Sequence, residues 1–544
     1  MNTDPGILAM EALHREAEKL NFSQTLGEFV HLRAEEHQDK VVARWFQEDK
    51  TLTYRELDEK AQVLASALLQ HGIRKGTHVA VMLPNCPEFL ISWVAIAHLG
   101  AVMVPVNTGY TGNELYYVLN DSNAQALIVD ENYLSSVSDM PEPLALLDNH
   151  RVFVRGSAPA DHVAFGTLLE QGALPFESPQ PVTPTDLLQI QYTSGTTGFP
   201  KGCMQPHEYW IMLGLLAALQ RGAKLEVSNV LIWSPFFYMD PMWQFLMTMQ
   251  LGGTAFIATR MSLSKFMDWL VDYEIHYCAF PEPTLKVHPP SDRDRDVKLK
   301  FISAFGWRGE ANREVEERFG LVARNSYGMT EIGGGISLPA GATHMVDQET
   351  CGLPAIRREV RIVDEQGQDV PQGEIGELWV AGRGIFWGYY NRPQANAESF
   401  TGKWFHTGDL FRRDENGYYY IVGRIKEMIK RAGENISARE LEAAIRSLDE
   451  VEEAAAVPVP DPLRKEEVKV YLKLRPGLTK ENCPPEKVIA HCQKRLAAFK
   501  IPRYYTYTDE FPRTPSNKIA KTRLIAETED LRFDSYDRVE NIWR

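Results

Sequence analysis

Residues 192–202 read Tyr-Thr-Ser-Gly-Thr-Thr-Gly-Phe-Pro-Lys-Gly, and the interpretation of the whole chain begins from this stretch. Leu188, Ile190 and Tyr192 alternate with polar residues, which predicts a strand leading into it. Glycines let the backbone approach a ligand closely, and successive backbone N–H groups in such a turn form a concave anion site. The hydroxyls add donors and Lys201 adds a positive charge. The stretch therefore predicts a phosphate-binding loop.

The loop differs from the P-loop of the common NTPases. Pro200 stands where that motif has the glycine before the lysine, and Gly202 follows the lysine in place of Ser or Thr. On composition alone, a turn rich in Gly, Ser and Thr is also compatible with an ordinary surface loop. The remaining motifs decide between these two interpretations.

The bulk composition narrows the classes of function. The chain has 544 residues, of which 44% are hydrophobic, and a net charge of −15, since 58 basic residues face 73 acidic ones. This balance disfavours nucleic acid or an anionic membrane as the main partner. The six cysteines form no Cys-x-x-Cys pair, so we expect a reducing cytoplasm rather than disulfides or a zinc site.

No segment is expected to cross a membrane. The N-terminus lacks the apolar core of a signal peptide. The most apolar run, 89–106, contains His98, Gly100 and Pro105, so it predicts a buried helix followed by a strand.

Helix and strand patterns alternate from Thr53 to about residue 337, which predicts mostly parallel sheets covered by helices on both faces. A proline-rich border at 138–185 separates two such regions, and 350–422 has the short strands of an antiparallel, barrel-like unit. We predict an α/β fold. Residues 1–424 would form a large domain with two doubly wound αβα subdomains and a distorted β-barrel, and 425–544 a small, mobile α+β domain.

Residues 325–331, Asn-Ser-Tyr-Gly-Met-Thr-Glu, form the second constellation. An adenine could stack on Tyr327, Thr330 could bond a phosphate, and Glu331 could hold Mg²⁺, a hard cation that prefers oxygen ligands. The alternative is structural: Thr330 followed by an acid is also a common helix N-cap.

The strings at 192–202 and 325–331 resemble those of the adenylate-forming superfamily, in particular its acyl-CoA synthetase branch. Further matching strings, in family order, are Arg-Gly-Glu-Ala at 308–311, Trp-Phe-His-Thr-Gly-Asp-Leu at 404–410, Gly-Arg-Ile-Lys-Glu at 423–427 and Arg-Thr-Pro-Ser-Asn-Lys at 513–518. The resemblance therefore spans most of the chain. The Ser-Tyr-Gly-Met-Thr-Glu and Gly-Glu-Asn-Ile-Ser strings look most like the crotonobetaine/carnitine–CoA ligase branch.

The resemblance implies a nucleotide site and assigns its residues. The residues implied for ATP are Thr193, Ser194, Gly195, Thr196, Thr197, Gly198 and Lys201 at the phosphates, Gly309, Glu310, Ala311, Ser326, Tyr327, Gly328 and Met329 near the adenine, and Asp409 and Arg424 at the ribose. A carboxylate suits the ribose because its two oxygens can accept from both hydroxyls. The residues implied for catalysis are Lys518, Thr330 and Glu331, the last also as the Mg²⁺ ligand. Lys426 is implied as the hinge and Gly433 as the residue beside the CoA tunnel.

Three positions depart from the family pattern. Arg308 replaces a glycine where the acyl pocket meets the nucleotide, Ala432 replaces the first glycine of the tunnel pair, and Asn517 replaces the glycine before Lys518. Asn tolerates positive φ better than most residues, so the last loop is expected to survive.

The reaction implied is a two-step ligation. A carboxylate attacks ATP to give acyl-AMP and pyrophosphate, and the thiol of coenzyme A then displaces AMP. ATP, Mg²⁺, CoA and a small-molecule carboxylic acid are the expected cofactors and partners. An acyl-AMP-forming or luciferase-like enzyme, or a non-catalytic nucleotide-binding relative, remains an alternative, and a homodimer is left open.

Residues 236–243 would border the acyl pocket, with Tyr238 and Asp240 as its candidates together with Trp307 and Arg308. Aromatic rings could form a cage for a quaternary ammonium group, which Asp240 would neutralise. The alternatives are a pocket for a bulky polycyclic acid, or a plain core cluster in which Asp240 is a helix N-cap before Pro241.

Overall fold

The computed structural model describes residues 4–193, 200–222, 224–305, 307, 309–431, 434–496, 498–514, 518–526 and 530–544. The described chain divides into two compact units. Unit 1 comprises 4–193, Pro200–Val360 and Val380–Phe405, and unit 2 comprises Arg361–Trp379 and His406–Arg544.

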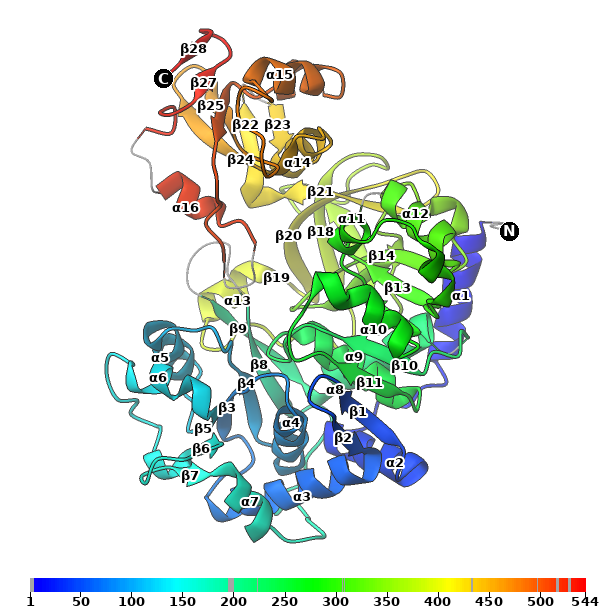
Figure 1. Cartoon of the computed structure of the whole chain (residues 1–544), viewed down its shortest axis with the longest axis vertical. Helices are drawn as coiled ribbons and strands as arrows, with labels where there is room; N and C mark the ends of the chain where they lie inside the picture. Colours follow the sequence, from blue (N-terminus) through cyan, green and yellow to red (C-terminus); the bar gives the residue numbers. More distant parts are fainter. Residues whose placement is uncertain are drawn as a thin grey trace. The chain divides into compact units, whose positions relative to one another are not determined.

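Unit 1 contains a seven-stranded sheet with the order β7-β6-β5-β3-β4-β8-β9 (Figure 1). Neighbouring strands are parallel from β7 to β8, and β9 returns antiparallel to β8. The strands are β3 (His78–Met82), β4 (Val102–Pro105), β5 (Ala126–Asp130), β6 (Val152–Arg155), β7 (Val163–Ala164), β8 (Leu187–Thr193) and β9 (Lys201–Pro206). The phosphate-loop motif therefore begins at the carboxyl end of a parallel strand, as the alternation before Tyr192 predicted.

A second, nine-stranded sheet of unit 1 has the order β16-β15-β14-β13-β12-β10-β11-β1-β2. Its central strands are parallel, and antiparallel strands complete both edges. The strands are β1 (Val41–Trp45), β2 (Lys50–Thr53), β10 (Asn229–Ile232), β11 (Thr254–Ile257), β12 (Tyr277–Ala279), β13 (Phe301–Ala304), β14 (Val322–Met329), β15 (Gly333–Ser337) and β16 (Leu353–Pro354).

Helices fill the space between these two sheets. The helix α4 (Pro87–Leu99) contacts β3 and β4 of one sheet and β2 of the other, and α8 (His207–Arg221) contacts β8, β9 and β15. Apolar contacts on both sides explain why α4 is buried almost all round. Other helices are α1 (Pro5–Ala17), α2 (Leu26–His37), α3 (Tyr54–Gln70), α5 (Gly112–Asp121), α6 (Leu134–Ser138), α7 (Phe165–Gln171), α9 (Met239–Gln250), α10 (Phe266–Asp272), α11 (Pro283–Val287), α12 (Gly309–Phe319) and α13 (Pro393–Ser399).

Short strands follow between residues 359 and 424, where the sequence predicted an antiparallel, barrel-like segment. They form a five-stranded sheet of β17 (Glu359–Val363), β18 (Gly376–Ala381), β19 (Phe400–Thr401), β20 (Trp404–Arg413) and β21 (Tyr419–Arg424). The strands β19, β20 and β21 pair in antiparallel fashion.

The C-terminal part of unit 2 is an α+β structure around a second seven-stranded sheet, in the order β23-β22-β25-β26-β27-β28 with β24 beside β25. Its elements are β22 (Met428–Arg431), β23 (Glu434–Ser437), α14 (Ala438–Arg446), β24 (Val451–Asp461), β25 (Lys465–Leu474), α15 (Pro485–Gln493), β26 (Tyr504–Tyr507), α16 (Lys521–Ala526), β27 (Tyr536–Asp537) and β28 (Ile542–Trp543). Helix α14 begins where the Ser437 side chain accepts from the N–H of Glu440.

The predicted fold class is confirmed: parallel sheets covered by helices, an antiparallel segment and a smaller α+β part occur in that order. The division at residue 425 stays a prediction, because unit 2 also includes 361–379 and 406–424. Within the described ranges, no helix combines the length and the apolar character needed to cross a bilayer.

Candidate functional site

The phosphate-loop motif is framed by a β-hairpin. Thr193 at the end of β8 pairs with Lys201 at the start of β9. The residues predicted to bind phosphate between them, Ser194, Gly195, Thr196, Thr197 and Gly198, lie outside the described residues. Gly202 is required by packing, because a Cβ at this position would lie 2.4 Å from Cγ2 of Ile190. The hairpin brings Lys201 to the carboxyl end of the parallel sheet, where ligands of α/β folds commonly bind.

Lys201 and the predicted metal ligand Glu331 contact the same tyrosine. Its Nζ is 4.6 Å from the ring centroid of Tyr389, within cation–π range. The Tyr389 hydroxyl donates to Oε1 of Glu331 at 2.9 Å, and both residues are buried. Burial, reinforced by the Glu331 carboxylate, raises the pKa of Tyr389 well above its usual value, so the phenol remains a donor. One tyrosine therefore contacts both a site cation and a site carboxylate.

Thr330 and Glu331 lie in the turn between β14 and β15. The carbonyl of Thr330 accepts from Gln205 Nε2 at 3.0 Å and from Tyr209 Oη at 2.9 Å. The carbonyl of Glu331 accepts from the N–H of Phe386 at 2.8 Å. The alternative of a helix N-cap at Thr330 is wrong, because a strand and no helix follows this turn.

A buried arginine, Arg358, hydrogen-bonds to the backbone that follows the Thr330–Glu331 turn. Its guanidinium donates to the carbonyls of Ile332 at 2.9 Å, Gly334 at 3.1 Å, Arg383 at 2.7 Å and Gly384 at 3.1 Å. Burial lowers the pKa of Arg358 to about 10. The side chain therefore joins the segment after Glu331 to the segment that leads to Tyr389.

The residues implied for the adenine lie on β14 and at the start of α12, two elements in contact. Gly309 begins α12, and a Cβ there would lie 2.3 Å from the carbonyl oxygen of Asp347. A Cβ at Gly328 would lie 2.4 Å from the carbonyl oxygen of Gly333. Glu310 and Ala311 follow in the first turn of α12, and Ser326, Tyr327 and Met329 lie on β14. Both glycines are therefore needed for backbone packing.

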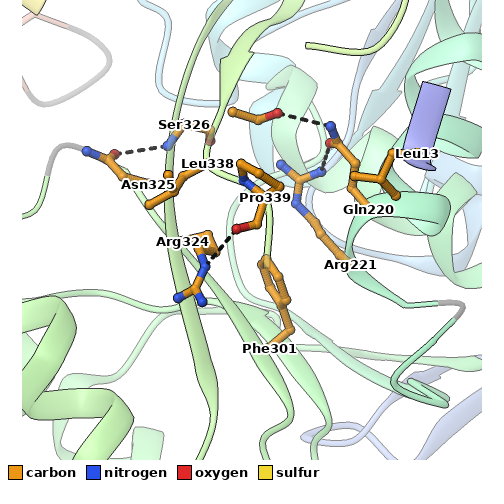
Figure 2. A pocket seen from close by; sticks show the side chains of 10 residues that line it. Leu13, Gln220, Arg221, Phe301, Arg324, Asn325, Ser326, Leu338 and Pro339 are labelled. Atoms are coloured by element: carbon orange, nitrogen blue, oxygen red, sulfur yellow. Dashed lines mark hydrogen bonds between the residues drawn. The ribbon is translucent and has the colours of Figure 1, made fainter. Parts of the chain in front are cut away.

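A small pocket lies next to Ser326 and is shown in Figure 2. Gln220 and Arg221 reach it from the end of α8, and Gln220 Nε2 donates to Ser337 Oγ at 3.0 Å. Arg221 Nε donates to Ser303 Oγ at 3.1 Å. The Ser326 hydroxyl is buried and has no hydrogen-bond partner within the part of the chain that the structure describes.

The predicted acyl-pocket residues follow parallel strands of the nine-stranded sheet. The chain leaves β10 toward β11 on one side and then forms β12 on the other, and ligands commonly bind at such a switch of direction. Tyr238 and Asp240 come after β10, and Trp307 comes after β13. Arg308 lies outside the described residues. Strand order thus explains why segments far apart in sequence end at one sheet edge.

Asp240 is exposed in the first turn of α9, and Tyr238 holds the N-cap position. The alternative of Asp240 as the N-cap is therefore wrong. Its Oδ1 accepts from Trp243 Nε1 at 3.0 Å, and the Arg221 guanidinium lies 5.2 Å from the centroid of the Trp243 ring. Trp307 is buried against Phe280 at a ring-centroid distance of 5.8 Å.

In unit 2, Asp409 and Arg424 face each other across the β20–β21 pair. Arg424 Nε lies 2.8 Å from Oδ1 of Asp409, which is 1% exposed. The preceding Gly408 has φ +71° and donates its N–H to Glu377 Oε1 at 2.9 Å. Both predicted ribose residues are therefore brought together.

Lys518 is exposed, and its backbone exchanges hydrogen bonds with Thr514: Lys518 N–H donates to Thr514 Oγ1 at 3.1 Å and Thr514 N–H donates to the Lys518 carbonyl at 2.8 Å. The backbone of Lys426 lies in the short 3₁₀ helix η6 (Ile425–Glu427). Gly433 lies outside the described residues.

Comparison with known proteins identifies the family. The model of the AMP-binding enzyme family matches residues 30–390, and that of the AMP-binding enzyme C-terminal domain matches 440–518. The chain belongs to the AMP-binding enzyme family. Among its relatives is the crotonobetaine/carnitine–CoA ligase of Citrobacter koseri, 32% identical over 493 residues, which cover 87% of this chain and 93% of that protein. The same enzyme of Proteus mirabilis is 31% identical over the same shares.

Solved structures of two other CoA ligases have the same fold as this chain. The o-succinylbenzoate CoA synthetase MenE of Bacillus subtilis, solved with its acyl-adenylate, aligns with a TM-score of 0.80 at 25% identity and covers 93% of this chain and 98% of its own. The anthranilate CoA ligase AuaEII has the same fold, with a TM-score of 0.82 at 22% identity over 94% of this chain and 98% of its own. The predicted activity is confirmed: this AMP-binding enzyme is an ATP-dependent acid–CoA ligase that acts through an acyl-adenylate.

Sequence reasoning missed Gln205, Tyr209, Arg358 and Tyr389. Gln205 stands in a strand that buries most of its residues, and a polar residue there was a usable signal. Tyr389 follows Gly388, but no local pattern predicts its role, because its partner Glu331 is far away in sequence. Arg358 binds backbone carbonyls, which leave no pattern in the sequence.

Proposed function

We propose that unit 1 binds the triphosphate of ATP through Thr193, Lys201 and the loop between them, with Glu331 as the carboxylate that holds Mg²⁺. The observation that carries this proposal is the contact series from Lys201 through Tyr389 to Glu331. It joins the end of the phosphate loop to the 326–331 motif, although the two lie far apart in sequence. A cation and a carboxylate that contact the same tyrosine match the needs of a metal–phosphate complex.

Glu331 fits Mg²⁺ by its chemistry. Mg²⁺ is usually bound through one or two carboxylates together with substrate phosphates, and Glu331 supplies a buried carboxylate oxygen on a turn fixed at both carbonyls. When bound, the ion would neutralise phosphate charge. The chain's own part is to orient the carboxylate, through the Tyr389 hydroxyl.

In the first step, the substrate carboxylate attacks the α-phosphorus of ATP, a P–O bond forms, and the bond to pyrophosphate breaks. Both reactants are anionic, so positioning and charge neutralisation supply most of the rate. Lys201 would hold the leaving pyrophosphate. Lys518 would bridge the substrate carboxylate and the phosphoryl oxygens where charge develops, and Asp409 with Arg424 would fix the ribose.

In the second step, the CoA thiolate attacks the acyl carbon, a thioester forms, and AMP leaves. We propose that rotation at Lys426 removes Lys518 from the nucleotide and that CoA passes Gly433. The resemblance of these segments to the acyl-CoA synthetase branch supports this proposal.

Two classes of acid are candidates. A betaine is favoured by the exposed Asp240 carboxylate next to Trp243, and by the names of the relatives from Citrobacter koseri and Proteus mirabilis. A bulky apolar acid is favoured by Arg221, because its guanidinium already covers the Trp243 ring that a cationic substrate would need.

A panel of acids tests the proposal. The chain is incubated with ATP, Mg²⁺, CoA and one acid at a time, taken from betaines, fatty acids, aryl acids and polycyclic acids, and acyl-AMP and acyl-CoA are measured by mass spectrometry. An acyl-CoA product names the acid class. Acyl-AMP without thioester would overturn the second step, and no product with any acid would overturn the assignment of the site.

We further propose a cytoplasmic location, supported by six cysteines that are all buried and unpaired with one another. A homodimer is the assembly to test. Light scattering after size exclusion would give the mass in solution, for which one chain is 61.7 kDa.

A further inference from the structure

Lys521 in unit 2 lies between two carboxylates. Its Nζ is 2.7 Å from Glu442 Oε1 and 3.0 Å from Glu427 Oε2. The Lys521 side chain is 19% exposed, and that of Glu442 is 13% exposed. Burial alone would lower the pKa of Lys521, but the two carboxylates outweigh it and raise the pKa, so the side chain stays charged. This is a shielded ionic cluster rather than a solvated surface pair.

The three residues come from separate segments of the chain. Glu427 is the last residue of η6, which contains the predicted pivot Lys426. Glu442 lies on α14, and its Oε1 also accepts from the N–H of Ala456 at 2.7 Å. Lys521 begins α16, three residues after Lys518. A single ammonium group therefore joins the pivot segment to the segment that carries Lys518.

A second ion pair, in addition to that of Lys521, lies at the other end of the loop that carries Lys518. Arg513 Nη2 lies 2.5 Å from Glu453 Oε2 on β24. Next to these two ion pairs, Ala520 N–H donates to the Pro512 carbonyl at 2.8 Å. The Arg513 ion pair connects the loop to β24. Of the two ion pairs, only that of Lys521 connects the loop to the pivot segment.

We propose that Lys521, paired with Glu427 and Glu442, is a positioning residue that couples the Lys518 loop to the pivot segment, so that the two move as one body. The proposal rests on the proposed role of Lys518 in adenylation. A lysine delivered by a rotating segment is useful only if the connection is stiff, since an error of about 1 Å in position can cost on the order of 10²-fold in rate.

The coupling predicts an unequal effect on the two half-reactions. Adenylation needs Lys518 at the reacting atoms, and thioester formation in the proposed cycle does not. A purely structural role would lower both half-reactions together, through loss of folded protein. The ratio of the two rates therefore separates positioning from stability.

The substitution Glu427→Gln tests this most cleanly, because Lys521 keeps its pair with the more buried Glu442. Glu440→Gln is the matched control: Glu440 also pairs with a lysine, Lys500, at 2.6 Å, and the side-chain exposures of 41% and 22% resemble the 34% and 19% of Glu427 and Lys521. Among the described side chains, neither Glu440 nor Lys500 forms an ion pair with η6 or with residues 512–521.

Both half-reactions are measured with crotonobetaine, or with the acid of the panel that gives most product. Adenylation is followed by acid-dependent ATP–pyrophosphate exchange, and the second step by CoA consumption from preformed acyl-AMP. For Glu427→Gln we expect exchange to fall about 10-fold and the second step to change less than about 2-fold. Glu440→Gln should change neither by more than about 2-fold.

A second pair of variants removes the lysine itself. Lys521→Met should lower exchange at least as far as Glu427→Gln, and Lys521→Arg should restore most of it because the charge is kept. Equal losses in both half-reactions, or no loss of exchange in Lys521→Met, would overturn the inference. Lys518→Ala is run beside them: if its exchange is normal, the proposed role of Lys518 fails, which is a separate result.

Discussion

In unit 1, Glu331 is buried, accepts from Tyr389 and sits on a turn whose backbone is bonded to Gln205, Tyr209 and Phe386. In unit 2, Lys518 is exposed at a loop whose backbone bonds to Thr514. The first arrangement fixes a charge before any ligand arrives. The second leaves a charge at an exposed position.

The difference matches the two tasks of the proposed reaction. Phosphate binding benefits from preorganised charges that cost no rearrangement during the reaction. A lysine that serves only one of two half-reactions must be able to leave. We therefore expect substitutions in unit 1 to alter nucleotide and metal binding in every step, and substitutions near Lys518 to act on one step.

The largest effect is expected for Lys518→Ala. Loss of a charge aimed at the developing negative charge should lower adenylation by about 10²–10³-fold, measured as ATP–pyrophosphate exchange. Thioester formation from preformed acyl-AMP should be nearly unchanged. Lys494→Ala, at an exposed lysine of the same unit, is the control and should leave both rates unchanged. Equal loss in both steps would break the comparison.

Arg358→Met tests the scaffold of unit 1. Removing this buried guanidinium leaves several carbonyls without a donor, and the free energy of unfolding should fall by about 3 kcal/mol, measured by urea denaturation. Arg55→Met removes an exposed pair with Asp39 and should cost less than about 1 kcal/mol. Similar losses of unfolding free energy for both variants would show that the buried hydrogen bonds of Arg358 contribute no more than an exposed ion pair.

Tyr389→Phe removes one hydroxyl and leaves the ring under Lys201. Since Glu331 loses a donor at 2.9 Å, we expect the Mg²⁺ concentration for half-maximal rate to rise and kcat/KM to fall about 10-fold. Calorimetric titration of ATP with and without Mg²⁺ should show a smaller gain from the metal. Tyr390→Phe is the neighbouring control, since its hydroxyl bonds to Asn123 at an exposed position. An unchanged metal dependence would remove Tyr389 from the site.

The smallest effect is expected for Asp240→Asn, and it depends on the acid. A cationic acid should lose about 1 kcal/mol of binding, within the range of a single partly exposed charge interaction, and a neutral acid of similar size should lose less. The KM values of the two acids give the result. An equal change for both would dismiss the proposed cage.

The sequence predicted the elements better than their contacts. Alternation before Tyr192 predicted the strand that the structure shows as β8, because strand periodicity is local, and the phosphate site after it stays a prediction. The Asp409–Arg424 pair followed from motif resemblance. The interaction of Lys201 with Tyr389 could not be predicted, since it depends on the pairing of the 387–390 segment with β9, which is distant in sequence.

The helix N-cap preference suggested a wrong alternative at two positions. Thr330 and Asp240 both have the residue type of an N-cap, yet one precedes a strand and the other lies inside the first turn of α9. In both cases the tertiary fold determined where the element begins, and the capping preference of about 1 kcal/mol was too weak to decide it.

The hydrogen bonds that Arg358 makes to the backbone have a consequence for directed evolution of this enzyme. Its hydrogen bonds to Ile332, Gly334, Arg383 and Gly384 all end on main-chain carbonyls. Every amino acid carries that group, so mutational libraries can vary the exposed side chain at 383 while these hydrogen bonds persist, and Ile332 is kept because it is fully buried. Sequence diversity can therefore be introduced next to the turn of Thr330 and Glu331, provided that position 358 is kept as arginine.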